Sequence, residues 1–491
     1  MSRVGRRKFV QQSALVATAL CGRPSKLFAD APAIFAAREQ NSPPLDAGTI
    51  RKLASQIAGH IITPDAPDYD SSRSIFNRAF DQRPALIVRC AGASDVARSL
   101  DFARSHNLPL AIRGGGHSRA GFSVCDGGMV IDLSAMNRVE VEADKLVVRA
   151  QAGALVRDLD QATQRFGLAT TSGGCPTVGV AGLTLGGGEG LLMTKYGTAC
   201  DNLLSARVVT VDGREIEASQ NSNPDLFWAI RGGGGNFGVL TALEYNLHPV
   251  TDVLAGTFTY PPGRIPELLQ AFAKFVAAAP DEIGLVGVVL PSEQGPRFQI
   301  LVCYFGDPRT GNDLLRPLRA LKPQEDKIRV ASYLETQTTI NPYSSVPHFQ
   351  TNLVLLELNP FAMEAITTAA NDGHSNTRVF IVPIYGAVTR VGLKDTAFPL
   401  RQPCCEVDLM GRWTSPAEKA SAMQWVRALR DKLQPFAKGA YSNQLGETSE
   451  ALVRASYGPN YARLAEIKKK YDPTNVLRLN QNIKPATSSG N

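Results

Sequence analysis

Histidine and cysteine are scarce in this sequence, and neither residue is spaced for metal binding. The 491 residues include six histidines and eight cysteines, with no CxxC, HxH or HExxH pattern, so no zinc site or metalloprotease is indicated. A GxSxG motif is also absent, which leaves a serine hydrolase without support. Beyond the N-terminus, no apolar run approaches the ~20 residues that span a bilayer. Chemistry must therefore be sought in other motifs.

Residues 1–33 differ in character from the rest of the chain. The stretch VGRRKFVQQSALVATALCG joins Arg6, Arg7 and Lys8 to a short apolar segment, and the small residues of ADAPA follow as a candidate cleavage site. The pattern resembles a twin-arginine export signal and predicts a periplasmic or secreted protein, the alternative being a basic N-terminus without this role. Removing its six Lys and Arg and its one Asp lowers the formal net charge from +7 to about +2, so neither nucleic-acid binding nor membrane attachment of the mature chain is predicted.

Composition and periodicity indicate a folded α+β protein. Hydrophobic residues make up 44% and charged residues 20% of the chain, and its length predicts two or three domains. PALIVRC and LPLAIR are strand-like and flank SDVARSLDFARSHN, a predicted helix with Ser94 as its N-cap, while VEVEADKLVVRAQAG predicts a hairpin. From about residue 251 to 440, strands and helices have Pro-rich joints and no glycine cluster, which indicates a second, inserted domain.

Three glycine-rich segments lie between residues 112 and 247. In IRGGGHSRAGFSVCDGG, three glycines precede His117, and a backbone without Cβ atoms permits close approach to a ligand, although a tight turn is the alternative. TTSGGCPTVGVAGLTLGGGEGLLMTKYG has seven glycines between Gly173 and Gly188, enough to wrap a flat ring and a pyrophosphate. RGGGGNFGVLTALEYNL contains a formal GxGxxG, but a strand is predicted after it where a Rossmann fingerprint needs a helix.

These segments, together with DLFWAIRGGGGNFGV and YGPNYARLAEIKKKYDPTNVLRLNQNIKP, resemble the berberine-bridge-enzyme-like FAD-linked oxidases of the vanillyl-alcohol-oxidase/PCMH superfamily. The likeness runs in order from about Gly59 to Pro485 and is weak from about 251 to 395. It implies an α+β fold with an FAD-binding domain in two parts, 34–250 and 441–485, and an inserted substrate domain at 251–440. That inserted domain is expected to have an antiparallel sheet flanked by helices, and 486–491 is a tail.

The resemblance implies that FAD is covalently bound. His117 stands where the family attaches the flavin 8α position, and Cys175 stands where some members attach C6. Imidazole and thiolate are suitable nucleophiles for both bonds. In the family, the residue at the position of Val178 helps to control access of O2 to the flavin, and valine resembles the residue found in oxidases. A dehydrogenase is the alternative. The other expected cofactor-binding residues are Arg113, Gly114, Gly115, Gly116, Ser118, Gly174, Thr177, Gly179, Gly182, Gly186, Gly187, Asn480 and Asn482.

Four residues are candidates for the catalytic base that alcohol oxidation requires. Glu406 and Asp408 alternate with apolar residues along a predicted strand, so the two acids share one face of it. Their mutual repulsion would raise the pKa of one of them. The alternative is that this face is solvated. Tyr441 matches a family tyrosine that helps to deprotonate substrate, and Glu189 replaces an aromatic residue found in many relatives. The alternative for Tyr441 is an ordinary half-buried tyrosine, and the alternatives for Glu189 are binding of a polyhydroxy substrate or an outward-pointing side chain.

The predicted function is an exported FAD-dependent oxidase of an alcohol or hemiacetal, with a carbohydrate favoured, that reduces O2 to H2O2. Its partners are then a small-molecule substrate, sugar or alcohol, and O2. The alternatives are a dehydrogenase with another acceptor, an oxidase of alcohols or alkaloids in secondary metabolism, and a flavin- or sugar-binding protein without turnover. Oligomeric state is left open.

Overall fold

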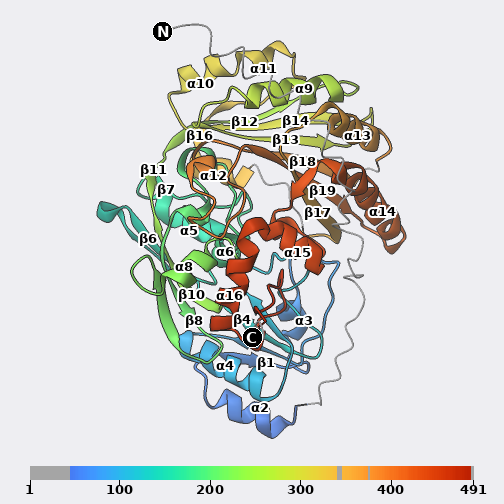
Figure 1. Ribbon diagram of the computed structural model, residues 1–491. Helices are drawn as coiled ribbons and strands as arrows, with labels where there is room; N and C mark the ends of the chain where they lie inside the picture. Colours follow the sequence, from blue (N-terminus) through green and yellow to red (C-terminus); the bar gives the residue numbers. More distant parts are fainter. Residues whose placement is uncertain (1–44, 340–344, 374–375, 488–491) are drawn as a thin grey trace.

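A computed structural model describes residues 45–339, 345–373 and 376–487. Two smaller sheets and the helices around them form the lower half in Figure 1, and a large sheet with its helices forms the upper half. The predicted export signal at 1–33 lies outside the described residues. Within the described ranges, no helix combines the length and the apolar character needed to cross a membrane.

The first small sheet is mostly parallel and buried. Its order is β1-β2-β4-β3, with β2 and β3 both parallel to β4, and a helix, α4, crosses over between β2 and β3. The predicted N-cap Ser94 is wrong, because α4 begins at Ala93 after Gly92. The buried carboxylate of Asp95 instead accepts the backbone N–H of Ala91, 2.9 Å away. The bounds are β1 His60–Ile62, β2 Leu86–Arg89, α4 Ala93–Ser105, β3 Leu110–Arg113 and β4 Met129–Asp132.

The second small sheet is antiparallel, in the order β5-β6-β10-β8-β9. β5 and β6 form the predicted hairpin, and β10 is the strand predicted after the third glycine segment. The bounds are β5 Val139–Glu142, β6 Val147–Gln151, β8 Leu203–Val209, β9 Glu215–Ser219 and β10 Val239–Asn246, with a separate pair β7 Leu168–Ala169 and β11 His248–Pro249. Nearby helices are α2 Ala47–Ala54, α3 Tyr69–Arg73, α5 Val156–Gln164, α6 Val180–Leu185, α7 Met193–Tyr196 and α8 Pro224–Ile230.

The large sheet is antiparallel and is built from residues 252–439. Its order is β15-β12-β14-β13-β18-β19-β17-β20, with β16 also paired to β12. Helices α9, α13 and α14 cover one face of it (Figure 1), and their apolar side chains share one buried cluster with those of the sheet. The strands are β12 Asp252–Thr259, β13 Ile283–Leu290, β14 Arg297–Tyr304, β15 Glu325–Asp326, β16 Arg329–Ser332, β17 His348–Leu355, β18 Thr377–Ile384, β19 Cys404–Arg412 and β20 Ala437–Gly439. The helices are α9 Ile265–Val276, α10 Pro308–Leu314, α11 Arg316–Ala320, α12 Tyr333–Thr339, α13 Pro360–Asn371 and α14 Pro416–Leu433.

The C-terminal helices return to the lower half. Tyr457 of α15 (Glu450–Tyr457) and Leu464 of α16 (Tyr461–Tyr471) belong to the same buried core as strands β2 to β10. Lys468 and Asp472 form a fully buried ion pair at the end of α16. Lys468 also donates to the backbone oxygen of Asn236, which anchors the chain end to the third glycine segment.

Candidate active site

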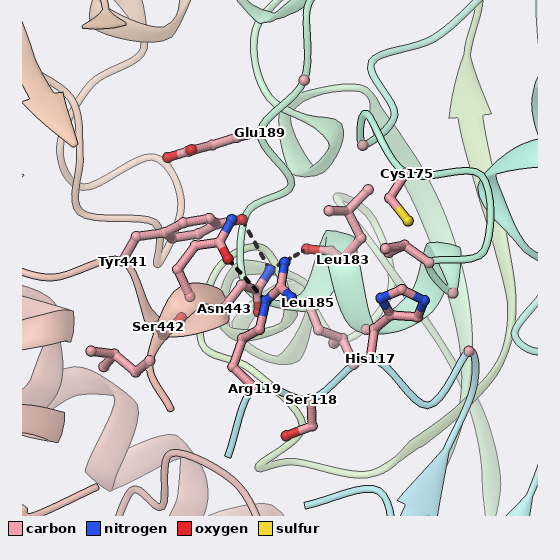
Figure 2. A pocket seen from close by; sticks show the side chains of 18 of the residues that line it. His117, Ser118, Arg119, Cys175, Leu183, Leu185, Glu189, Tyr441, Ser442 and Asn443 are labelled. Carbon is pink, nitrogen blue, oxygen red and sulfur yellow. Dashed lines mark hydrogen bonds between the residues drawn. The ribbon is translucent and has the colours of Figure 1, made fainter. Parts of the chain in front are cut away.

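A cavity of about 570 Å³ separates the glycine-rich segments from the free face of the large sheet. It brings together residues that are far apart in sequence, and Figure 2 shows His117 and Cys175 on one side with Tyr441 and Glu189 on the other. Among the predicted site residues, those that line it are Gly114, Gly115, Gly116, His117, Ser118, Gly174, Cys175, Val178, Gly179, Gly182, Glu189, Asp408, Tyr441 and Asn480.

Six predicted site residues stand outside the wall of this cavity. Arg113 is buried and paired with Asp132 at 3.4 Å. Thr177 contacts His117 of the wall, and Glu406 is hydrogen-bonded to Asn352. Gly186 and Gly187 pack against Asn443 and Phe398, and Asn482 lines a neighbouring cavity of about 280 Å³.

The first two glycine segments touch each other through their backbones. A Cβ atom on Gly115 would lie 2.2 Å from the nitrogen of Gly179, so glycine is required at this contact. By contrast, Gly174, Gly182 and Gly235 line the cavity with nothing within 4 Å of a Cβ position. The open backbone there fits a large flat cofactor held by main-chain groups.

The third glycine segment also reaches the cavity, through Gly234, Gly235 and Gly238. Sequence reasoning rejected a Rossmann fingerprint here and assigned no cofactor role to these glycines. Their likeness in composition to the first two segments could have indicated a cofactor-binding role. The strand that follows them excludes the Rossmann geometry but not other modes of cofactor binding.

His117 is held as a neutral imidazole. Its ring stacks on Phe76 at 3.9 Å between centroids, and its Nε2 lies 2.9 Å from the hydroxyl oxygen of Thr177. Burial, reinforced by the positive charge of Arg119, lowers the pKa of His117 to about 3. The Cys175 sulfur lies 3.4 Å from the same Thr177 hydroxyl. Two nucleophiles therefore flank one hydroxyl group at the cavity wall.

Three carboxyl groups gather at the opposite side. Glu189 and Asp408 line the cavity, and Glu406 lies behind them, where its Oε1 accepts a 2.7 Å hydrogen bond from Asn352. Burial raises the pKa of Glu189 to about 7 and that of Asp408 to about 6. Burial and the neighbouring Asp408 and Glu189 carboxyls raise the pKa of Glu406 well above its usual range. Each of the three carboxyls keeps one buried oxygen without a hydrogen-bond partner among the described residues.

The hydroxyl of Tyr441 accepts two hydrogen bonds. The donors are the backbone N–H of Gly188 at 3.0 Å and the side-chain amide of Asn443 at 2.9 Å. Figure 2 shows the second of these bonds. Burial, together with the Glu189 and Glu406 carboxyls, raises the pKa of Tyr441 well above its usual range. The phenol therefore stays protonated, and with two donors already directed at its oxygen it can donate its own proton into the cavity.

The large sheet gives the cavity an apolar wall. Asp408 of β19 pairs with Phe380 of β18, which in turn pairs with Val288 of β13. The apolar wall residues on these strands and on β14 are Leu285, Val286, Val288, Leu290, Leu301, Phe380, Val382 and Pro383, and the polar ones are Gln299, Arg378 and Asp408. Within residues 45–339, 345–373 and 376–487, no three His, Cys, Asp or Glu side chains come together as a metal site.

Comparison with known proteins points to FAD-linked oxidoreductases. A family model described as an FAD binding domain matches residues 84–219, and one described as berberine and berberine like matches residues 440–484. The chain is similar to (R)-6-hydroxynicotine oxidase of Paenarthrobacter nicotinovorans, with 33% identity over 459 residues that cover 89% of this chain and 99% of that protein. It is also similar to an uncharacterized FAD-linked oxidoreductase of Bacillus subtilis, with 32% identity over 446 residues that cover 89% and 99%.

Solved structures share the fold. The crystal structure of 6-hydroxy-D-nicotine oxidase from Arthrobacter nicotinovorans has a TM-score of 0.82 and 29% identity, covering 91% of this chain and all of that one. The xylooligosaccharide oxidase of Myceliophthora thermophila has a TM-score of 0.81 and 23% identity, covering 90% and 100%, and shows likeness of fold alone.

The fold, the glycine-lined cavity and these similarities define an FAD-dependent oxidoreductase. The chain belongs to the berberine-bridge-enzyme-like family of FAD-linked oxidoreductases. The predicted family, the α+β fold class and FAD as cofactor are thereby confirmed.

Proposed function

We propose that this protein is an exported oxidase that converts an apolar alcohol to the corresponding carbonyl compound, with FAD bound covalently through His117 and Cys175. The observation that carries the proposal is the position of Asp408. Its carboxyl lines the same cavity as His117 and Cys175 and has one oxygen without a partner among the described residues. Export is proposed from the resemblance of residues 1–33 to a twin-arginine signal.

The two attachment residues are suited to bond formation. A neutral imidazole has a free lone pair at neutral pH, and the pKa of His117, lowered to about 3, keeps it neutral. The Cys175 sulfur reaches the cavity wall on a glycine-flanked loop. The Thr177 hydroxyl between them orients both side chains.

Asp408 acts as the base in this proposal. With a pKa of about 6 it is mostly ionised at neutral pH, and it accepts the proton of the substrate hydroxyl. Tyr441 donates its O–H to the substrate oxygen and positions that hydroxyl beside Asp408. FAD held by His117, Cys175 and the glycine segments would supply the acceptor for a hydride from the substrate carbon, with O2 as the final acceptor of the two electrons and H2O2 as the product.

The wall of the large sheet favours an apolar substrate. A sugar needs hydrogen-bonding partners around most of its ring, whereas β13 and β18 present Val286, Val288, Phe380 and Val382 to the cavity. The carbohydrate favoured from sequence is therefore replaced by an alcohol with an aromatic or aliphatic body. (R)-6-hydroxynicotine oxidase, a relative by sequence, also acts on a compound with an aromatic ring by its name.

The first test is the flavin linkage. Purified mature protein is denatured, acid-precipitated and digested, and flavin is sought by mass on the peptides that contain His117 and Cys175. Flavin on both peptides supports the proposal, and yellow supernatant with bare peptides overturns the covalent attachment.

The second test is turnover of aryl and alkyl alcohols in an oxygen electrode, with oligosaccharides as the comparison series. O2 consumption with H2O2 formation supports an oxidase. Reduction of a dye acceptor without O2 consumption identifies a dehydrogenase, and turnover of oligosaccharides alone overturns the apolar substrate.

A further inference from the structure

Arg378 is a charged residue in the apolar wall of the cavity. It lies on β18, is half-buried and lines the cavity beside Phe380 and Leu290. Apart from the backbone pairing of β18 with β19, no hydrogen bond or ion pair joins the Arg378 side chain to any of the described residues. A guanidinium has five N–H donors, so this side chain has unused binding capacity that faces the substrate space.

Three buried arginines elsewhere in the protein each form an ion pair with a carboxylate of the protein. Arg113 is paired with Asp132, Arg401 with Asp201, and Arg430 with Glu447. Each guanidinium thus has a carboxylate supplied by the protein, as burial of a charge requires. Arg378 is only half-buried and has no such carboxylate, so its guanidinium is available to an anion that arrives with a ligand.

Strand register places Arg378 on the same face as the proposed base. Arg378 pairs with Met410, and Phe380 pairs with Asp408, so the two charged residues stand on diagonally related positions of β18 and β19. Such diagonal neighbours have Cα atoms roughly 7–8 Å apart. Phe380 and Met410 belong to one small apolar cluster and fill the space between the two charges on this face.

The other cation of the cavity has a different environment. Arg119 follows Ser118, donates to Gln444 at 3.2 Å, and lies 3.4 Å from Nε2 of His348. Its charge acts on Asp408 and His117. Arg119 thus belongs to the side of the cavity where the proposed flavin attachment lies, whereas Arg378 belongs to the sheet wall.

We propose that Arg378 binds a carboxylate on the substrate, so that the substrate is an apolar hydroxy acid. This inference rests on the proposed function and specifies its substrate class. The hydroxyl-bearing carbon lies at Asp408, the aromatic or aliphatic body lies against Phe380 and Val288, and the carboxylate forms a paired hydrogen bond with the Arg378 guanidinium.

The test measures binding without turnover. The FAD-loaded enzyme is titrated at low ionic strength with benzoate, 3-phenylpropanoate and 4-phenylbutanoate, and separately with their primary amides, while the visible absorption of the flavin is followed. At least one carboxylate is expected to bind about 10-fold more tightly than its amide, because a hydrogen bond to a charged group is stronger than a neutral one.

Two variants assign the effect to one side chain. Arg378→Gln should reduce the preference for the carboxylate to less than about 3-fold. Arg297→Gln is the matched control, since Arg297 is also half-buried on the large sheet, opposite Leu290, but does not line the cavity. It should keep the full preference. Salt should weaken carboxylate binding to the wild type and to Arg297→Gln, and not to Arg378→Gln.

Several results overturn the inference. These are equal binding of carboxylates and amides, a preference that survives in Arg378→Gln, an equal loss in both variants, or no spectral change with any carboxylate. The probes carry no hydroxyl group, so the result does not depend on alcohol oxidation. Carboxylate binding through Arg378 in an enzyme that oxidises no alcohol would overturn the proposed function and leave the anion site in place.

Discussion

His117 and Cys175 both contact a single hydroxyl group, that of Thr177. The distances are 2.9 Å to Nε2 of His117 and 3.4 Å to Sγ of Cys175. The two residues are separated by 58 positions in the printed sequence and come from different glycine-rich segments. Gly115 and Gly179 bring those segments into backbone contact and so make the relationship between the two nucleophiles possible.

Thr177→Val should impair covalent flavin attachment at both residues. The substitution keeps the shape of the side chain and removes the hydroxyl that orients His117 and Cys175. We expect a mixture of unlinked, singly linked and doubly linked peptides, measured by mass after digestion. Thr338→Val, on the exposed side of α12, is the control and should match the wild type. Full double attachment in Thr177→Val would contradict this role.

Asp408→Asn should lower kcat by a factor of about 10² to 10⁴, the usual range for loss of a general base. The base works in its ionised form, and its pKa is raised to about 6, so wild-type activity should fall as pH drops below about 6. The variant should lack this acidic limb in a profile of kcat/KM against pH.

Glu406→Gln provides the comparison for Asp408. Burial and the neighbouring Asp408 and Glu189 carboxyls raise the pKa of Glu406 well above its usual range, which favours its protonated form, and glutamine has nearly the shape of a protonated glutamate. Its kcat should therefore stay within about 10-fold of the wild type, since no general base is lost. A larger loss in Glu406→Gln than in Asp408→Asn would reverse the assignment of the base.

Tyr441→Phe should lower kcat by about 10- to 100-fold and leave flavin content unchanged. The pKa of Tyr441 is raised, so its role is that of a donor, and no basic limb from a tyrosinate should be seen in the pH profile. Steady-state rates across pH 6 to 10 test this. Activity in the wild type that rises steeply above pH 9 and is flat in the variant would show instead that the phenolate is the base.

Lys468→Met should destabilise the protein by about 3–5 kcal/mol, because it leaves the fully buried Asp472 without its partner. The control is Lys470→Met on the same helix, whose ion pair with Asp225 is exposed to solvent and should be worth about 0–1 kcal/mol. Urea unfolding of both variants gives the comparison. Equal losses of stability would argue against a special role of the buried pair.

Stability should decrease as pH rises from about 4 to 7, in part through Asp160. This carboxyl is buried, accepts hydrogen bonds from Ser172 and Gln337, and has its pKa raised from 3.8 to about 7 by burial. The folded protein therefore holds a proton that the unfolded chain releases in this window, and the free energy of unfolding falls as pH rises.

Asp160→Asn isolates this contribution. The variant should gain stability relative to the wild type between pH 5 and pH 8 in urea unfolding experiments, because an amide has no charge to bury. Asp101→Asn, at an exposed position of α4, should leave the slope unchanged. A wild-type slope that persists in Asp160→Asn would assign the effect to other groups.

The carboxyl groups of β19 show which features of the site can be predicted from the sequence and which cannot. The alternation of polar and apolar residues predicted that Glu406 and Asp408 share a face of the strand. The same pattern also allowed that face to be solvated, and this interpretation is wrong, because the two residues are 0% and 4% exposed. Asp408 lines the cavity, whereas Glu406 does not and is hydrogen-bonded by Asn352, which lies 54 positions away on the neighbouring strand. That pairing has no local signal.

The sequence by itself determined the family, the α+β class, the glycine segments and the pair His117 and Cys175, because these follow from local composition, periodicity and motif spacing. The tertiary structure decided which residues face one cavity. In the tertiary structure, Arg113, Gly186 and Gly187 have packing or ion-pair contacts and do not line the cavity. Gly234 and Gly235 line it instead, and Arg378 lies in its apolar wall. The pKa of each buried acid was decided there as well, since burial and neighbouring charge arise only when distant strands and loops come together.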